Sequence, residues 1–167
     1  DLIMLCSVEY GFNSQVGIGY GFTNSSNAGA TYAGRTTGNE TSASTSSSKT
    51  PMSYRGIENF WGNIWQHIDG VNISARVMYV CDDLSFVDGT DTGHTAISFP
   101  LPGTSGPYIT NIGYDSTNDW IMMASSSNNT TNPPAVIGDQ ILTTDNGGWM
   151  VGLFGGQWNN GNVAGIY

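Results

Sequence analysis

Four aspartates fall in one polar loop, DDLSFVDGTDTGHT, directly after the second cysteine. They are Asp82, Asp83, Asp88 and Asp91. Several carboxylates on one loop can bind calcium, because this cation takes oxygen ligands. The loop lacks the ordered ligand spacing and the closing Glu of an EF-hand. The sequence therefore offers a candidate site for one cofactor, calcium. The alternative, which we favour, is that this loop is a solvated turn.

The two histidines and the two cysteines match no metal or redox motif. His67 lies within an apolar repeat and His94 in a Gly/Thr-rich loop, with no third ligand visible for zinc. Cys6 and Cys81 either form one disulfide or stay reduced, and we favour buried free thiols.

Catalytic motifs are equally scarce. The chain has no G-x-S-x-G nucleophile elbow, and neither cysteine stands in a recognisable histidine-paired signature. Paired carboxylates such as Asp115 and Asp119 could in principle carry out glycoside hydrolysis, but a solvated loop explains them better. We therefore expect a protein that is not an enzyme, with a glycan hydrolase as the least favoured alternative.

The C-terminal segment LFGGQWNNGNVAGIY sets aromatic and amide side chains among glycines. Aromatic faces offer rigid contact area, and amides form hydrogen bonds without the desolvation cost of a charge. This mixture predicts a ligand-contacting surface; the alternative is that Phe154 and Trp158 are core residues and the Asn run is a turn. The candidate residues are Phe154, Gln157, Trp158, Asn159, Asn160, Asn162, Val163 and Tyr167.

The composition narrows the class of partner. Of 167 residues only 10% are charged, and 13 acids against four bases give a net charge of −9. So few bases argue against nucleic-acid binding, which needs Lys and Arg to neutralise phosphates, and no stretch is long and apolar enough for membrane insertion. A polar but uncharged surface is typical of secreted adhesins, phage appendages and sugar-binding proteins.

Helical periodicity appears early in the chain. Residues 2–10 predict a short buried helix, and IENFWGNIWQHI, residues 57–68, places large apolar side chains at spacings of three and four. Gly62 interrupts this second pattern and indicates a close backbone approach. Between the two, the Ser/Thr/Gly-rich residues 23–50 predict a long exposed loop.

Short strands dominate the rest. Asp69-Gly70 predicts a turn, and residues 71–73 and 76–81 predict a hairpin. Residues 108–114 and 120–124 have strand propensity, SSSNNTTNPP predicts an exposed loop, and the C-terminal Gly/apolar alternation predicts tightly packed short strands. The expected fold class is α+β, with few helices, short antiparallel strands and long irregular loops, in a single domain over 1–167.

GNIWQHIDGVNI resembles the G-N-V-W-E-W motif of the formylglycine-generating-enzyme (sulfatase-modifying factor) branch of the C-type-lectin-like fold. LCSVEYG, at 5–11, resembles the preceding helix of that family, and Gly155-Gly156-Gln157-Trp158 resembles its later G-G-S-W segment. The string YRGIENFWGNIWQHIDGVNI is similar to phage tail and prophage proteins of this fold. Some of these are diversified by retroelements at a C-terminal Gly/Asn/Trp-rich segment.

The resemblance implies a C-type-lectin-like domain that presents ligand-contacting side chains from its C-terminal segment. The family's catalytic cysteine pair has no match, since no cysteine follows Cys81, which argues against oxidase activity. The family's first strand and helix would precede residue 1, and its last strand would follow residue 167. We therefore expect the chain to be incomplete at both ends.

The leading hypothesis is a receptor-binding domain of a phage or prophage tail or fibre. It would attach to a bacterial surface receptor or glycan, alongside other tail subunits and as a homo-oligomer, on a virion or another extracellular surface. The alternative is a structural tail or capsid decoration domain without a ligand.

Overall fold

The computed structural model describes residues 52–103, 108–128 and 147–157, with the single positions Leu5, Val8, Glu9, Gly21, Ala30, Ile141 and Thr143. Contacts divide these residues into two compact units. The first holds the described residues before position 67 together with 154–157, and the second holds those from 67 to 153. Among the described residues, no helix has the length and apolar character needed to cross a membrane. The loop expected over 23–50 lies outside the description, apart from Ala30, which is exposed.

The described part is β-rich, so the α+β class expected from the sequence is wrong. Strands make up 44% of it and helix 3%. The helix expected over 2–10 is represented by helical backbone at Leu5, Val8 and Glu9 alone. Its buried character is not seen at these positions, since Leu5 and Val8 are 45% and 78% exposed.

The expected helix over 57–68 does not form, because the backbone there turns repeatedly. Asn59 and Gly62 have φ of 57° and 70°, in the left-handed region that a right-handed helix excludes. The apolar residues consequently do not share a buried face: Trp61 is fully buried, but Ile64 and Trp65 are 56% and 41% exposed.

Gly62 is a point of close approach, as its place in the sequence predicted. Its amide donates to the Gly155 carbonyl at 2.6 Å. A Cβ added to Gly21 would stand 2.5 Å from the Gly62 Cα. Neither backbone could keep this separation with a side chain in between, so the glycines determine how these segments pack.

The first unit contains a short hairpin and an isolated β-bridge between Asn63 and Gln157. Strands β1 (Ser53–Tyr54) and β2 (Ile57–Glu58) are antiparallel and pair Tyr54 with Ile57. The two residues between them, Arg55 and Gly56, both have positive φ, which is the geometry of a type I′ hairpin turn. Met52, Tyr54 and Trp61 form the buried centre.

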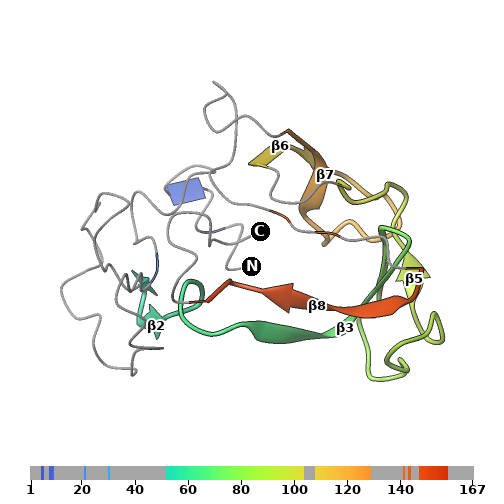
Figure 1. Ribbon diagram of the computed structural model, residues 1–167, viewed down its shortest axis with the longest axis horizontal. Coiled ribbons are helices and arrows are strands. Elements are labelled where there is room, and N and C mark those ends of the chain that lie inside the picture. The colour runs from blue at the N-terminus through green and yellow to red at the C-terminus, as the bar shows by residue number, and fades with distance from the viewer. Residues whose placement is uncertain are drawn as a thin grey trace. The chain divides into compact units, whose positions relative to one another are not determined.

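The second unit contains a four-stranded sheet in the order β5-β4-β3-β8 (Figure 1). Its strands are β3 (Gln66–Ser74), β4 (Val77–Val80), β5 (Thr95–Ala96) and β8 (Trp149–Phe154), of which β3 starts and β8 ends at the border between the units. The expected hairpin is confirmed, with Val71 opposite Val80 and Ser74 opposite Val77. The turn lies at Ala75-Arg76, whereas Asp69-Gly70 is part of β3.

Strands β6 (Tyr108–Gly113) and β7 (Met123–Asn128) form a separate antiparallel pair in the same unit. The strand expected over 120–124 therefore begins later and continues through Ser125–Ser127, which the sequence placed in a loop. The buried apolar residues of this unit are Met78, Val80, Ile97, Leu101, Ile109, Ile121, Ala124 and Ile141. They come from both sheets, from the connections that join β5 to β6 and β6 to β7, and, for Ile141, from the chain between β7 and β8.

Candidate functional site

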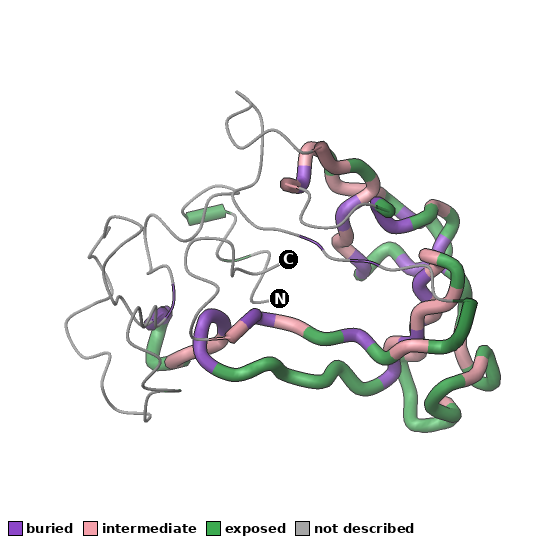
Figure 2. The backbone as a smooth tube through the Cα atoms, viewed as in Figure 1, coloured by how far each residue is buried: buried purple, intermediate pink, exposed green. Residues whose placement is uncertain are grey.

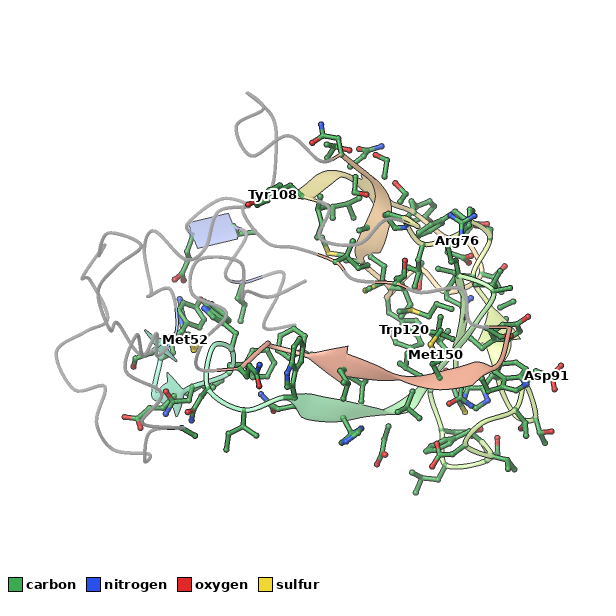
Figure 3. All side chains as sticks on the ribbon, in the orientation of Figure 1. Met52, Arg76, Asp91, Tyr108, Trp120 and Met150 are labelled. Atoms are coloured by element: carbon green, nitrogen blue, oxygen red, sulfur yellow. The ribbon has the colours of Figure 1, made fainter. Side chains whose placement is uncertain are left out.

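The connection between β6 and β7 displays two large aromatic side chains. Tyr114 and Trp120 are 71% and 53% exposed, at the two ends of the 114–120 loop; Trp120 is labelled in Figure 3. Ser116, Thr117 and Asp119, which lie between them, are exposed as well. We take these five residues as the candidate site.

Asp115 holds the loop from inside. Its side chain is 1% exposed, and one carboxylate oxygen, Oδ1, accepts the backbone amides of Thr117 and Asn118, each at 2.8 Å. The Asn118 side-chain amide donates to the same oxygen at 3.3 Å. The other oxygen, Oδ2, accepts the backbone amide of Ser98, the second residue after β5. This carboxylate therefore fixes the loop's own turn and ties it to a distant segment.

The electrostatics agree with this anchoring role. Hydrogen bonds to the charged form, from the Asn118 amide first and then from Ser98 and Thr117, outweigh burial and lower the pKa of Asp115 to about 2. The carboxylate is thus ionised at neutral pH. A charged group satisfied by protein amides is a rigid anchor for the aromatic residues on either side of it.

Chemically, the loop suits non-covalent recognition. Exposed Tyr and Trp side chains have few rotatable bonds and provide apolar ring faces. The hydroxyl and carboxylate groups between them can form hydrogen bonds. Two exposed aromatic residues on a loop held by internal hydrogen bonds can offer contact area at a low ordering cost.

The Asp115–Asp119 pair does not have the form that glycoside hydrolysis requires. Asp119 is exposed, but Asp115 is buried with both carboxylate oxygens engaged by amides. A nucleophile, general acid or general base has to reach the substrate or a water molecule with such an oxygen. The structure gives Asp115 a positioning role instead.

The backbone carbonyls of the acidic loop after β4 accept the hydrogen bonds that hold this loop in place. The Nδ2 atom of the buried Asn72, on β3, donates to the carbonyls of Val87 and Thr90 at 3.2 and 2.8 Å. The Val87 amide donates to the Thr92 carbonyl at 3.0 Å. These bonds close a compact loop whose outer surface is exposed (Figure 2).

The four calcium candidates do not converge. Asp82, Asp83, Asp88 and Asp91 are all exposed, and Asp91 is labelled in Figure 3. In the described part of the chain, no three His, Cys, Asp or Glu side chains gather in a way that could hold a metal. Asp83 instead closes a local turn: its Oδ1 accepts the Ser85 amide at 2.6 Å, and hydrogen bonds from Ser85 lower its pKa.

The histidines and the described cysteine make local contacts. His67 is exposed on β3, and His94 packs against the Phe86 ring at 5.6 Å, with its Nδ1 3.1 Å from the Thr92 carbonyl oxygen. Cys81 is a partly exposed free thiol, not a buried one, and its Sγ lies 3.3 Å from the Asp83 carbonyl oxygen. Cys6 lies outside the described residues.

The C-terminal candidate residues are described only at their start. Phe154 packs on Phe60 with ring centroids 4.7 Å apart, and Gln157 forms a parallel bridge with Asn63. Both are part of the first unit's scaffold. The remaining candidates lie outside the described residues: Trp158, Asn159, Asn160, Asn162, Val163 and Tyr167.

The comparisons with known proteins found no matching family model, no similar curated protein and no similar solved structure.

Sequence reasoning missed the aromatic pair because it assigned Tyr114 and Trp120 to strands. The signal lay between them, in DSTND at 115–119, a run of residues whose side chains bond to nearby backbone amides. Such a run between two strand-like segments predicts a tight, self-bonded loop with its flanking residues at the surface.

Proposed function

We propose that this protein is a non-catalytic ligand-binding domain, of the receptor-binding kind carried on a phage tail or fibre. It attaches to a ligand on a bacterial surface, from a virion or another extracellular surface. Other tail subunits are its structural partners. The observation that carries the binding role is the exposure of Tyr114 and Trp120 on a loop anchored by Asp115.

Three further features support this role. The resemblance of GNIWQHIDGVNI to phage tail proteins points to the particle. The surface is poor in charge, with 10% charged residues, so contacts by aromatic rings and uncharged polar groups are the ones that it can offer. The loop is preorganised, which lowers the entropic cost of association.

A structural tail or decoration domain is the second candidate, and one observation favours it. The described start of the segment expected to contact ligand is part of the first unit's scaffold. Phe154 packs against the Phe60 ring, and Gln157 forms a β-bridge with Asn63. If the rest of that segment also serves packing, the C-terminal residues contribute to assembly and the 114–120 loop alone to binding.

Adsorption to intact bacteria tests the proposal. Fluorescently labelled protein is applied to a panel of bacterial strains and bound protein is measured by flow cytometry. We expect the double variant Tyr114→Ala/Trp120→Ala to lose at least about tenfold in apparent affinity, since a contact aromatic contributes on the order of 2 kcal/mol. Trp65→Ala is the matched control, because Trp65 is also exposed, at 41%, but lies in the other unit.

A second variant separates the two candidate surfaces. Trp158→Ala/Asn160→Ala reduces adsorption if the C-terminal segment contacts the ligand and leaves it unchanged if that segment serves packing. Thermal denaturation verifies that every variant is folded. Full adsorption by both double variants, or no adsorption of the parent protein to any strain, would contradict the proposed function.

A further inference from the structure

The sequence contains two Asp-Gly pairs in similar local contexts. They are Asp69-Gly70, within IDGV, and Asp88-Gly89, within VDGT. Each aspartate follows a β-branched residue and precedes a glycine, so the two pairs should have similar intrinsic reactivity. A difference in reactivity between them in the folded protein therefore has to come from the structure.

An Asp-Gly pair can rearrange its own backbone. The glycine nitrogen attacks the Cγ atom of the protonated aspartate side chain, a C–N bond forms, and the carboxyl hydroxyl leaves with the amide proton as water. A water molecule then opens the resulting succinimide ring. Opening at the carbonyl that came from the backbone leaves isoaspartate, whose main chain is one methylene longer. Glycine favours the attack because it has no Cβ to hinder it.

The structure leaves the Asp88-Gly89 pair accessible for this reaction. Both residues are exposed, in a turn of the acidic loop after β4. No described residue accepts a hydrogen bond from the Gly89 amide, and a Cβ added to Gly89 would meet no atom within 4 Å. The Gly89 nitrogen can therefore approach the Asp88 side chain without breaking a hydrogen bond of its own or displacing a neighbour.

Strand β3 restrains the Asp69-Gly70 pair. Asp69 is exposed, but both residues belong to the strand and Gly70 is buried. The Gly70 carbonyl accepts the Cys81 amide at 2.9 Å, and a Cβ added to Gly70 would stand 2.8 Å from the Cys81 carbonyl oxygen. Moving the Gly70 nitrogen onto the Asp69 side chain would pull this part of β3 away from β4. The reaction at Asp69 thus requires local opening of the sheet.

We propose that Asp88-Gly89 is a self-modification site, at which the folded protein converts Asp88 to isoaspartate while Asp69 stays intact. Water is the one co-reactant, and the carboxylate charge is kept. The inference goes beyond the proposed ligand-binding function and is independent of the 114–120 loop.

Conversion of Asp88 would loosen the loop that contains it. The carbonyls of Val87 and Thr90, on either side of the pair, both accept hydrogen bonds from the Asn72 Nδ2 atom. An added methylene between these carbonyls changes their separation, so the two bonds cannot both keep their geometry. Asn72 is fully buried, so water does not replace a lost bond there. The modified protein should consequently be less stable.

Incubation of the full chain in heavy-oxygen water tests the proposal. The folded protein is kept for weeks at body temperature and mildly acidic pH, and each succinimide that reopens takes up one heavy oxygen atom. Trypsin cleavage after Arg76 places Asp69 and Asp88 on different peptides, and fragment ions locate the label. We expect Asp88 to take up label at least about tenfold faster than Asp69, because the strand site has to open first. In the urea-denatured chain the two rates should be similar.

Asp88→Glu is the matched control, since Glu keeps the charge but would have to close a larger ring, which forms far more slowly. This variant should take up no label at position 88 and should keep its melting temperature after incubation, whereas the melting temperature of the parent falls. Enzymatic methylation of isoaspartate should mark the Asp88 peptide of the parent alone.

Three results would overturn the proposal. They are the absence of isoaspartate at Asp88, equal labelling of Asp69 and Asp88 in the folded protein, and a rate difference that persists in urea. An unchanged melting temperature of protein converted at Asp88 would overturn the predicted loosening of the loop. Adsorption to bacteria tests the 114–120 loop separately, so failure of one proposal is distinguishable from failure of the other.

Discussion

Asp115 shows how one buried charge can organise an exposed loop. Its carboxylate accepts hydrogen bonds from Ser98, Thr117 and Asn118, which belong to the loop itself and to the segment after β5. Removing the charge would leave these amides inside the protein with a weaker acceptor. The exposed aromatic residues next to Asp115 depend on this anchor for their position.

This anchor predicts an acid-dependent stability. Since the folded-state pKa of Asp115 is about 2 and an unperturbed Asp titrates near 3.9, its charge stabilises the fold fully above about pH 4. That contribution is lost as the pH falls toward 2. Urea denaturation of the parent and of Asp115→Asn, followed from pH 7 to 2, should show a lower and flatter profile for the variant. Parallel profiles for the two proteins would contradict the anchoring role.

At the scale of elements, the β3–β4 hairpin uses a turn that its residues do not favour. Ala75 and Arg76 have φ of 48° and 64°, as a two-residue type I′ turn requires. Residues with a Cβ adopt this region at a cost, and Asn-Gly is the preferred pair. The pairing of β3 with β4 compensates for this cost, because it places Met78 and Val80 in the core.

The turn predicts a stabilising substitution. Ala75→Gly should raise the free energy of unfolding by about 0.5–1 kcal/mol, as relief of the positive φ exceeds the added entropy of the unfolded chain. Differential scanning calorimetry should show a melting temperature higher by about 1–4 °C. Ala96→Gly, at an exposed position of β5, is the control and should lower the melting temperature or leave it unchanged. A destabilised Ala75→Gly variant would contradict this account of the turn.

For the whole molecule, the balance of charge and aromatic exposure determines what kind of contact is available. Thirteen acids against four bases leave little positive charge for attracting anionic surfaces such as bacterial envelopes. Contacts through Tyr114 and Trp120 do not depend on net charge. Adsorption should therefore respond weakly to salt.

Salt titration of bacterial adsorption tests this point. From about 0.1 M to about 1 M NaCl the Debye length falls from about 10 Å to about 3 Å. The apparent affinity should change by less than about twofold over this range, because aromatic contact is not screened. A decrease in apparent affinity of about tenfold or more would show that charged groups, such as the exposed aspartates, dominate binding and that the aromatic pair does not.

Local chemistry in the sequence was sufficient for several features. The hairpin at β3–β4 follows from strand propensity on both sides of a short link, and the close approach at Gly62 follows from a glycine within an apolar pattern. Strand β8 follows from Gly/apolar alternation. Each of these was indicated by a pattern of residues that are neighbours in the chain, although the partners of Gly62, Gly155 and Gly21, are distant.

Other features depend on contacts between distant residues, and the tertiary structure decided them. The spacing of Ile57, Trp61 and Ile64 fits a helix, but positive φ at Asn59 and Gly62, with the bond from Gly62 to Gly155, gives turns instead. Likewise, local bonds close the turn at Asp115, but only the tertiary structure brings the Ser98 amide, 17 residues away in the chain, to its carboxylate. Local periodicity indicates which secondary structure a segment favours in isolation. Long-range hydrogen bonds then determine whether the segment adopts that secondary structure in the fold.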